Sequence, residues 1–410
     1  MKIALLGYGK EGQAAEKYFS KFDADFTIMS DFDPKEVAKA DYSAYDLVLR
    51  SPSVHPFPAA TSLTRYFFEH CPCPIIGVTA TKGKGTTCSF IKSLLDALGE
   101  KAFLVGNIGV PAIGVLDELT PDSVVVYEMS SFQLWDLERS PSVAVVGTIE
   151  PDHLNVHDGF DDYISAKANI GRHQSVDDTL VYFANNPDTK HIADESPAQK
   201  LTYPNADIDE FVLDAVVIPG QHNRENAMAA LLAVSAFYHL DIKEFIAKNR
   251  KKIMAGLSAF HGLPHRLEYL REANNVLYYD DNFSTNPAST KVAIAAFPDQ
   301  NVVVIVGGRD KTDNADIPEI YEVISTAPNI KKIVLMGESG HELAKRYEND
   351  KFIVVESLEE AVNTARTEAE KLATAEHKAV VLMSPTAASF DMFKDVYDRG
   401  DQFKALVEKI

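Results

Sequence analysis

Cysteine is scarce in this sequence, which has 3 cysteines among 410 residues. Three cysteines cannot form a paired disulfide framework or a four-cysteine zinc site, and the spacing of Cys71 and Cys73 differs from the C-x-x-C pattern of redox pairs. The scarcity excludes a small disulfide-stabilised secreted module. It favours a protein that works in the reducing cytoplasm.

Long apolar segments are also missing. No run approaches the roughly 20 apolar residues that a membrane-spanning helix needs. The first residues lead at once into a strand pattern and a glycine loop, without the apolar stretch and the small-residue cleavage site of a signal peptide. We therefore expect a cytoplasmic protein with no membrane partner.

An excess of basic residues is lacking as well, since 60 acidic residues outnumber 40 basic ones and give a formal charge of -20. Nucleic acids are bound by basic surfaces, so this balance argues against a nucleic-acid partner. It does not exclude small phosphate ligands, which need only a local set of donors. The remaining composition, 46% hydrophobic and 24% charged over 410 residues, is typical of a globular protein with two or three domains.

The most informative segment runs from residue 75 to residue 98. It contains an apolar strand pattern, the glycine-bearing loop 79–85 and a helical pattern that opens at Thr86. A strand, a glycine loop and a helix N-terminus direct backbone N–H groups at one point, and Lys84 adds an ammonium, so the segment predicts a polyphosphate-binding loop. The match is incomplete because Gly85 stands where the common pattern G-x-x-x-x-G-K-[ST] has a hydroxyl. An ordinary strand-to-helix turn is the alternative for this segment alone.

A second glycine loop lies near the start of the chain. The strand pattern of residues 2–6 runs into Gly7-Tyr8-Gly9-Lys10-Glu11-Gly12, and the acidic Asp31 follows about 20 positions on, as in dinucleotide sites. Only about 70 residues precede the phosphate loop, which is short for a dinucleotide fold built from two halves. A single nucleotide or the diphosphate of a nucleotide sugar fits better. The proline-punctuated loop 50–58, which contains Ser51, is expected to form one wall of this site.

Apolar strand patterns alternate with helical patterns along the whole chain, which predicts an α/β protein with parallel sheets covered by helices on both faces. Breaks in this alternation at 71–74 and 260–266 divide the chain into three predicted domains. These are an N-terminal Rossmann-like nucleotide-sugar domain (1–74), a central P-loop ATPase-like domain (75–260) and a C-terminal Rossmann-like domain (261–410).

Polar residues follow several of the predicted strands, where ligands of parallel sheets gather. Glu128 and His153 follow two strands of the central set, and together they favour a divalent-metal site near Lys84. Either residue alone is as readily a hydrogen-bonded surface group. By pattern alone, Lys167 is a solvated surface lysine on a helix. Asn223, at the start of a long apolar helix, is a candidate nucleotide contact, although N-capping explains it equally well.

Taken together, these motifs resemble the Mur ligase family over essentially the whole length of the chain. The most discriminating elements are Ser130-Ser131-Phe132-Gln133-Leu134 and the C-terminal Ala388-Ser389-Phe390-Asp391, which continues through Phe393-Lys394 to Arg399-Gly400. Further matching elements are the two glycine loops, Gly106-Asn107-Ile108-Gly109, Asp152-His153, Ala166-Lys167, Gly220-Gln221-His222-Asn223 and Gly262-Leu263-Pro264-His265-Arg266.

The resemblance implies an ATP-dependent amide ligase, similar to the family members that add D-glutamate to UDP-N-acetylmuramoyl-L-alanine during peptidoglycan precursor synthesis. In such ligases ATP phosphorylates a carboxylate, and the incoming amine attacks the acyl phosphate. This chemistry suits the residues, because phosphorylation supplies a leaving group while metals and lysines neutralise the crowded anions. The implied cofactors are ATP and Mg²⁺ at two sites, and we expect a monomer that acts on small molecules.

The resemblance also implies roles for individual residues. Catalysis would involve Lys84 at the β- and γ-phosphates, Lys167 as a carbamate, His153 and Lys311. The metal ligands would be Thr86, Glu128, His153 and the carbamylated Lys167. The ATP contacts would be Thr81, Lys82, Gly83, Lys84, Gly85, Thr86, Thr87, Asn223, Arg266 and Asp281. The substrate contacts would be Gly7, Tyr8, Gly9, Lys10, Glu11, Gly12, Ser30, Asp31 and Ser51 at the UDP end, Asn107 and Ser131 at the muramoyl group, and Ser389 and Phe390, with Lys311, at the incoming amino acid.

The chain departs from the family pattern at three positions. Phe283 stands where a lysine is usual, Val396 where an aromatic residue is usual, and Ala80 where the phosphate loop has a glycine. The first two departures leave the identity of the added amino acid open. The order Lys84-Gly85-Thr86 is more like that of folylpolyglutamate synthases, which also ligate glutamate and are the first alternative. The second alternative is a non-catalytic nucleotide-sugar- or dinucleotide-binding protein without ATP turnover.

Overall fold

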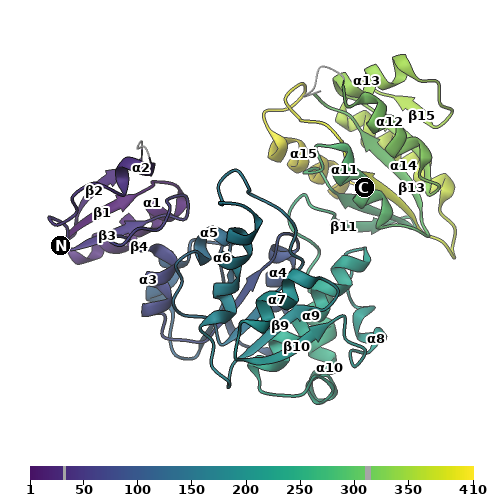
Figure 1. Ribbon diagram of the computed structural model, residues 1–410. Coiled ribbons are helices and arrows are strands. Elements are labelled where there is room, and N and C mark those ends of the chain that lie inside the picture. Colours follow the sequence, from purple (N-terminus) through teal and green to yellow (C-terminus); the bar gives the residue numbers. More distant parts are fainter. Residues whose placement is uncertain (31–33, 310–314) are drawn as a thin grey trace. The chain divides into compact units, whose positions relative to one another are not determined.

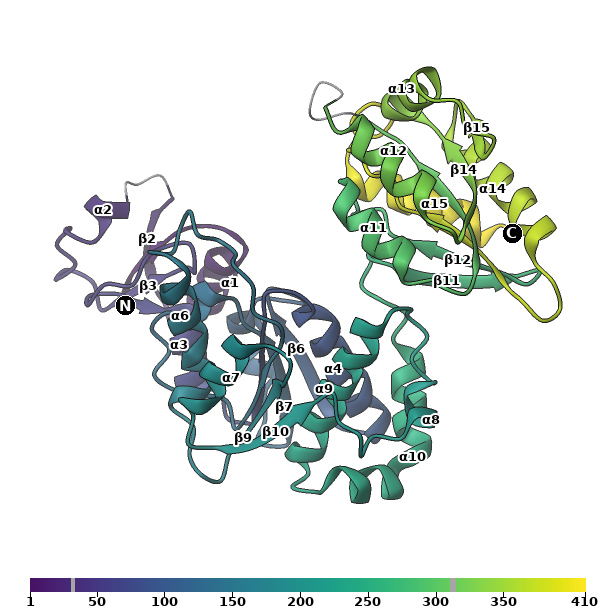
Figure 2. The same cartoon turned by 45° about the vertical axis from the view of Figure 1, so that its right-hand side comes forward.

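The computed structural model describes residues 1–30, 34–309 and 315–410, so the predicted site residues Asp31 and Lys311 lie outside the described residues. The described chain forms three sheets in two compact units (Figures 1 and 2). The first unit comprises residues 1–216 and 224–259, and the second comprises residues 217–223 and 260–410.

The first sheet has four parallel strands in the order β2-β1-β3-β4. Its inner strand β1 (Lys2–Leu6) is buried from its second residue onward, because helices and loops cover both faces of a parallel sheet. The other elements of this part of the chain are α1 (Lys10–Phe19), η1 (Ser20–Phe22), β2 (Asp25–Met29), α2 (Pro34–Val37), β3 (Leu47–Arg50), β4 (Thr61–Ser62) and α3 (Leu63–His70).

The second sheet, also in the first unit, has six parallel strands in the order β10-β9-β8-β5-β7-β6. Its inner strand β5 (Ile75–Thr79) is buried at every residue and leads directly into the phosphate loop. The following elements are α4 (Lys84–Leu98), β6 (Lys101–Gly106), η2 (Ala112–Glu118), β7 (Ser123–Glu128), α5 (Ser131–Leu134), β8 (Val143–Val146), α6 (Phe160–Arg172), β9 (Thr179–Phe183), α7 (Pro187–Asp194), β10 (Gln199–Tyr203), α8 (Glu210–Leu213), α9 (Gln221–Phe237) and α10 (Ile242–Ala259).

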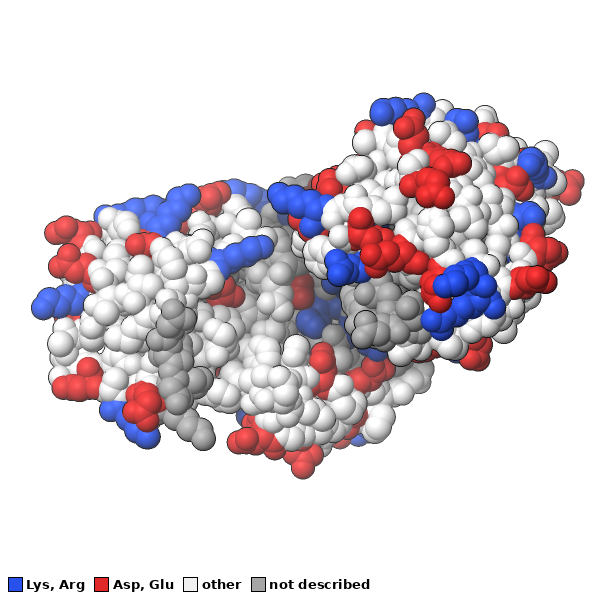
Figure 3. Space-filling view, turned by 90° about the horizontal axis from the view of Figure 1, so that it is seen from above, with Lys and Arg blue, Asp and Glu red and all other residues white. Residues whose placement is uncertain are grey.

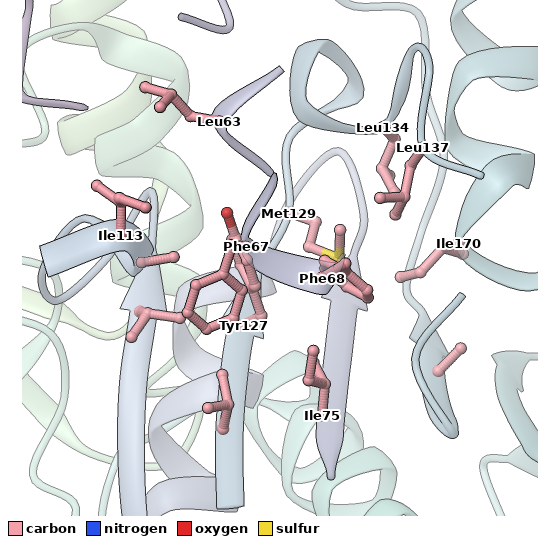
Figure 4. Packing of buried hydrophobic residues seen from close by; sticks show 14 of the residues in the cluster. Leu63, Phe67, Phe68, Ile75, Ile113, Tyr127, Met129, Leu134, Leu137 and Ile170 are labelled. Carbon is pink, nitrogen blue, oxygen red and sulfur yellow. The ribbon is translucent and has the colours of Figure 1, made fainter. Parts of the chain in front are cut away.

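A continuous apolar core joins the two sheets of the first unit. Figure 4 shows Phe67 of α3 beside Tyr127 of β7, and their rings meet edge to face with centroids 5.6 Å apart. Phe67 is fully buried and Tyr127 nearly so. This contact therefore packs α3, which follows the last strand of the first sheet, against the second sheet.

Helix α10 packs closely against the phosphate-loop helix α4, and Gly256 permits the approach. A Cβ atom at Gly256 would lie 3.0 Å from both the Cα of Leu94 and the carbonyl oxygen of Ser93. The hydroxyl of Ser93 donates a hydrogen bond to the carbonyl oxygen of Gly256 at 2.6 Å. The α4 helix is therefore held along its length by an element that is more than 150 residues away in sequence.

The third sheet forms the second unit and has the order β11-β12-β16-β13-β14-β15. Of the strands described in this sheet, only β11 runs antiparallel to its neighbour. Alternate residues of β13 enter two separate apolar clusters, so both faces of the sheet are covered. The elements are β11 (Glu268–Ala273), β12 (Val276–Asp280), α11 (Pro287–Ala295), β13 (Asn301–Val306), α12 (Ile317–Thr326), β14 (Ile330–Leu335), α13 (Gly337–Arg346), β15 (Phe352–Val354), α14 (Leu358–Leu372), β16 (Ala379–Met383) and α15 (Val396–Glu408).

The predicted α/β fold with parallel sheets is confirmed. One local expectation is corrected, because α4 begins at Lys84 and not at Thr86. Gly83 adopts a φ of +83° and turns the chain directly into the helix.

Among the described residues, no helix is long and apolar enough to cross a bilayer. On the face shown in Figure 3, basic and acidic side chains are interspersed, with no broad basic surface.

Candidate active site

The phosphate loop lies between β5 and α4, where the sequence predicts it. Its last residue, Gly83, has a left-handed backbone, and a Cβ there would lie 2.7 Å from the side-chain oxygen of Asn226. The left-handed backbone therefore favours glycine, and any other residue would also displace the Asn226 side chain. The N-terminus of the 15-residue helix α4 follows at once, so the positive end of the helix dipole faces the loop.

Two lysines converge on the carbonyl groups of this loop. The ammonium group of Lys84 donates to the carbonyl oxygens of Ala80 at 2.8 Å and Thr81 at 3.1 Å. Lys167, from α6, donates to the same Ala80 oxygen at 3.0 Å and to the hydroxyl of Thr79 at 3.1 Å. Lys84, the first residue of α4, and Lys167 of α6 thus meet at one atom, although they are 83 positions apart in sequence.

Lys167 is not a surface lysine, and the prediction made from pattern alone is wrong. Its side chain is 1% exposed and lies over the ring of Tyr163. Burial lowers the pKa of Lys167 well below its usual value, and the positive charge of Lys84 lowers it further. The carboxylates of Asp152 and Glu128 oppose this shift. The four groups therefore interact electrostatically in one place.

Glu128 is the last residue of β7, and it is buried. In the sheet register it lies opposite Val78, one residue before the end of β5, so it faces the start of the phosphate loop. Its backbone oxygen accepts a hydrogen bond from the N–H of Asn107 at 3.3 Å. The structure therefore brings Glu128 and Asn107 to the same sheet edge as Lys84 and Lys167.

The two threonines after Gly85 differ in their surroundings. Thr87 is buried, and its hydroxyl donates to the side-chain oxygen of Asn226 at 3.3 Å. Thr86 is half-buried, so it is the more accessible hydroxyl in the first turn of α4. The remaining loop residues, Thr81 and Lys82, both contact Glu150: Thr81 accepts from its N–H at 2.9 Å, and Lys82 pairs with its carboxylate at 2.9 Å.

His153 lies in the loop after β8, with a left-handed φ of 54°. Its side chain is half exposed, 3.6 Å from the carboxylate of Asp152 and 5.0 Å from the ring of Phe132. The chain thus places His153 next to Asp152, which is one of the carboxylates that act on Lys167.

Sequence reasoning missed His157, which holds the predicted substrate residue Ser131. One ring nitrogen of His157 lies 2.7 Å from the carboxylate of Asp162, and the other lies 2.9 Å from the hydroxyl of Ser131. The imidazole is buried and stacks on the ring of Phe132 with an interplanar angle of 9°. Ser131 is therefore fixed by a carboxylate–imidazole–hydroxyl chain. The pairing with Asp162 at i+5 gives no helical or strand signal that would have revealed it.

The N-terminal glycine loop connects β1 to α1, as predicted. Gly7 has a φ of +85°, and a Cβ there would lie 2.1 Å from the hydroxyl oxygen of Ser51. A Cβ at Gly12 would lie 2.4 Å from the carbonyl oxygen of Gly7. The tight turn and the close approach of the 50–58 loop therefore both need glycine. Of the other residues predicted to bind UDP, Tyr8 and Gly9 lie in the turn, Lys10 is the first residue of α1, and Ser30 follows β2.

Glu11 links the first sheet to the second. It accepts a hydrogen bond from the side-chain amide of Gln133 at 2.8 Å, and burial raises its pKa to about 7. The nearby Arg50 is fully buried; it donates to the carbonyl oxygen of Val54 at 2.7 Å and pairs with Asp136. These contacts join the N-terminal glycine loop to the Ser130–Leu134 region of the second sheet.

The second unit holds the remaining predicted ATP contacts. Asp281 follows β12 and is buried; its carboxylate accepts from the N–H of Leu267 at 3.1 Å and from the hydroxyl of Ser384 at 2.8 Å. Arg266 places its guanidinium 5.2 Å from the ring centre of Phe283, the residue that replaces the usual lysine. Asn223 is buried and donates to the carbonyl oxygen of Pro219 at 2.7 Å, which supports a structural role for it as well.

The predicted amino-acid contacts Ser389 and Phe390 follow β16 in the same unit. Among the described residues, the buried hydroxyl of Ser389 has no hydrogen-bond partner, whereas the side chain of Phe390 is 61% exposed. A buried hydroxyl without a partner is uncommon. Val396, at the start of α15, uses its backbone oxygen to accept from Asn282.

A cluster of His265, Glu268 and Asp280 has ligand atoms within 4.8 Å of one another. The ammonium of Lys404 lies 2.7 Å from Glu268, and His265 is 2.7 Å from Asp280. A lysine thus already supplies positive charge at this cluster. We interpret the cluster as a structural polar network.

Comparison with known protein families places two matches along the chain. Residues 78–214 match the Mur ligase middle domain, and residues 265–386 match the Mur ligase glutamate ligase domain. The first match covers the phosphate loop, Glu128, His153 and Lys167. The second covers Arg266 and Asp281.

Individual relatives extend the similarity to the whole chain. The chain is 31% identical over 466 residues to UDP-N-acetylmuramoylalanine--D-glutamate ligase from Acetivibrio thermocellus, covering 100% of this chain and 96% of the relative. The fold is similar to the crystal structure of UDP-N-acetylmuramate-alanine ligase MurC from Thermotoga maritima, with a TM-score of 0.58, 18% identity, and coverage of 100% and 99%. It is also similar to folylpolyglutamate synthase from Thermotoga maritima, with a TM-score of 0.58, 14% identity, and coverage of 85% and 92%.

Proposed function

Because the chain belongs to the Mur ligase family, we propose that it is an ATP-dependent ligase that joins D-glutamate to UDP-N-acetylmuramoyl-L-alanine. The full-length similarity to ligases of that name supports the choice of substrates. The observation that carries the proposal is the convergence of Lys84 and Lys167 on the carbonyl of Ala80, with Glu128 at the neighbouring strand end.

The phosphate loop suits ATP. The backbone N–H groups after Gly83 suit the oxygens of a polyphosphate, and the ammonium of Lys84 suits the β- and γ-phosphates. Thr86 and Glu128 would hold one Mg²⁺, and His153 with Lys167 a second. The hydroxyl, carboxylate and imidazole groups are ordinary ligands for divalent cations. Bound Mg²⁺ supplies positive charge to the phosphates.

The reaction has two steps. A carboxylate oxygen of UDP-N-acetylmuramoyl-L-alanine attacks the γ-phosphorus, and the bond to the β,γ-bridging oxygen breaks, which releases ADP and leaves an acyl phosphate. The amine of D-glutamate then attacks the acyl carbon, phosphate leaves, and the amine loses a proton. Lys84 neutralises negative charge that would otherwise repel the attacking carboxylate.

Lys167 suits the role of a carbamate. An amine must be uncharged to attack CO₂, and burial beside Lys84 lowers the pKa of Lys167 well below its usual value. The reaction forms an N–C bond to CO₂ and releases one proton, which converts the lysine into an anion. The carbamate would ligate the metal, and it would lose the hydrogen bonds that the Lys167 amino group donates to Thr79 and Ala80.

Carbon-13 NMR of the protein in labelled bicarbonate tests this role. We expect a carbamate signal that disappears in Lys167→Arg, whose guanidinium is not nucleophilic. The Lys92→Arg variant is the control, because Lys92 lies on α4 and pairs with Asp96. The absence of a signal that depends on Lys167 would contradict the proposed carbamate.

The other predicted residues complete the proposed site. Gly7 to Gly12, Ser30, Asp31 and Ser51 bind UDP, and Asn107 and Ser131 bind the muramoyl group, with His157 orienting Ser131. Asn223, Arg266 and Asp281 contact ATP, and Lys311, Ser389 and Phe390 contact D-glutamate.

We also propose three domains, at residues 1–74, 75–260 and 261–410. We propose that the enzyme is a monomer and works in the cytoplasm.

A phosphate-release assay tests the proposed function. With ATP, Mg²⁺ and UDP-N-acetylmuramoyl-L-alanine, we expect phosphate release that depends on D-glutamate and not on L-glutamate. Lys84→Ala should abolish it, whereas the matched control Lys92→Ala on the same helix should retain it. No phosphate release with either glutamate isomer or with other common amino acids would contradict the proposal.

A folylpolyglutamate synthase activity is the second candidate, because the chain has the order Lys84-Gly85-Thr86 and shares its fold with such an enzyme. The same assay separates the two. ADP production that depends on a folate and L-glutamate, without any response to the UDP substrate, would favour this candidate.

A further inference from the structure

The chain passes from the first sheet to the second through a short segment that contains two cysteines. Cys71 follows the last residue of α3, and Cys73 lies two residues before β5. Their sulfur atoms are 3.6 Å apart, and the Cys71 thiol donates to the carbonyl oxygen of Cys73 at 3.5 Å. Both side chains are half-buried against the apolar core of the first unit.

Both ends of this segment are fixed by backbone hydrogen bonds. The N–H of Cys71 donates to the carbonyl oxygen of Phe67 at 2.8 Å, and the carbonyl oxygen of Pro74 accepts from Val125 at 3.0 Å. Pro72, between the cysteines, has a restricted φ. The backbone therefore holds the two thiols together, and the sulfurs need only approach from 3.6 Å to the bonded distance of about 2.05 Å.

We propose that Cys71 and Cys73 form a reversible dithiol–disulfide site that is oxidised by a low-molecular-weight disulfide such as glutathione disulfide. The sequence spacing alone argues against a redox pair, because C-x-C is not the C-x-x-C pattern. The fold overrides that argument, since it places the two sulfurs in contact.

The reaction proceeds by two thiol–disulfide exchanges. The Cys71 thiolate attacks one sulfur of the glutathione disulfide, which forms a mixed disulfide and releases one glutathione. The Cys73 thiolate then attacks the Cys71 sulfur and releases the second glutathione. Two cysteine thiols lose two electrons and two protons in total, and the oxidant gains both.

The order of attack follows from the environment of each thiol. A hydrogen bond between the two side chains lowers the pKa of Cys71, and the same hydrogen bond together with burial raises that of Cys73. Cys71 is therefore the better thiolate and the first nucleophile. Cys88, the third cysteine, is fully buried, and burial raises its pKa well above the usual value, so it serves as an internal control.

The test is the intact mass of the native full-length protein after equilibration with glutathione disulfide and rapid alkylation of the free thiols. We expect the wild-type protein to lose two hydrogen atoms, to carry no glutathionyl group, and to regain two alkylatable thiols after dithiothreitol treatment. Cys73→Ser should instead retain one glutathionyl group on Cys71, because no thiol can resolve the mixed disulfide. Cys88→Ser should behave as the wild type.

Three outcomes would overturn the proposal. The first is a wild-type protein that carries stable glutathionyl groups. The second is a wild-type protein whose two thiols stay alkylatable at every oxidant concentration. The third is a loss of two hydrogen atoms that depends on Cys88. The wild-type measurement decides the first two without any variant. Peptide mapping of the oxidised wild-type protein decides the third, even if a variant does not fold.

Discussion

At the residue scale, Asp281 couples the stability of the second unit to pH. Burial raises the pKa of its carboxyl group to about 7 from the ordinary value of 3.8. Between these values the folded protein holds a proton that the unfolded chain releases, so the free energy of unfolding falls as the pH rises. The maximal slope for one group is about 1.4 kcal/mol per pH unit.

Asp281→Asn therefore tests the carboxyl group. We expect the unfolding midpoint of the wild-type second unit to fall between pH 5 and pH 7, and the variant to show a smaller fall, because its amide does not titrate. Thermal unfolding of both proteins across this range measures the difference. Equal slopes for the two proteins would show that Asp281 is ionised in the folded state.

Thr86 is the second residue-scale case. The hydroxyl of Thr87 donates a hydrogen bond to Asn226, so the hydroxyl of Thr86 is the accessible one in the first turn of α4. Thr86 stands one residue later than the hydroxyl residue of the common phosphate-loop pattern. Because each helical residue rotates the side chain by about 100°, the shift changes its direction.

We expect Thr86→Ala to raise the Mg²⁺ concentration for half-maximal phosphate release about tenfold, which corresponds to about 1.4 kcal/mol. Ser89→Ala, one turn further along α4, is the matched control and should leave the Mg²⁺ dependence unchanged. An unchanged Mg²⁺ dependence in Thr86→Ala would show that its hydroxyl is not a metal ligand.

Lys167 and His157 show what sequence cannot reveal at this scale. A lysine between small residues of a helix is ordinarily exposed, yet the packing of α6 places this one against Thr79 and Ala80 of the phosphate loop. His157 owes its position to Ser131 and Asp162. Both environments are made by residues that are distant in sequence or lack a periodic spacing, so only family resemblance indicated Lys167 and nothing indicated His157.

At the element scale, the fully buried polar side chain of Arg399 anchors the first turn of α15. Its guanidinium donates to the carbonyl oxygens of Ala387, Ala388 and Asn282 at 3.1–3.2 Å and also to the side chain of Asn282. Burial lowers its pKa to about 10. The arginine therefore ties the C-terminal helix to the loops after β12 and β16.

Arg399→Gln should lower the free energy of opening around β12 and β16 by about 3–5 kcal/mol, because several buried carbonyls lose a charged donor. Hydrogen exchange of peptides from these strands measures the change. Arg346→Gln is the matched control, since its exposed ion pair with Glu342 contributes at most about 1 kcal/mol. Unchanged protection in Arg399→Gln would contradict the role assigned to this arginine.

Most strands of the fold are predictable from the sequence because burial leaves a clear apolar pattern. Strands such as β5, β8 and β16 are buried at every residue and therefore appear as unbroken apolar runs. The edge strand β10 begins with two exposed polar residues, Gln199 and Lys200, and gives no such run. The start of α4 was misplaced by two residues, because the left-handed conformation of Gly83 is set by its tertiary surroundings.

At the scale of the whole molecule, long-range polar pairs join the two sheets of the first unit. Arg50 pairs with Asp136 across 86 positions, and Glu11 accepts from Gln133 across 122 positions. These pairs bring the predicted UDP loop to the same unit as the phosphate loop. Sequence predicts each loop separately, because strand and glycine signals are local, but it does not predict the pairs that join them.

The central claim is that the chain activates the carboxylate of UDP-N-acetylmuramoyl-L-alanine as an acyl phosphate, which D-glutamate then attacks. The most direct test uses that substrate with heavy oxygen in its carboxylate, together with ATP, Mg²⁺ and D-glutamate. We predict that one heavy oxygen atom appears in each phosphate released, with formation of the D-glutamyl amide. Amide formation with unlabelled phosphate, or no amide at all, would contradict the claim.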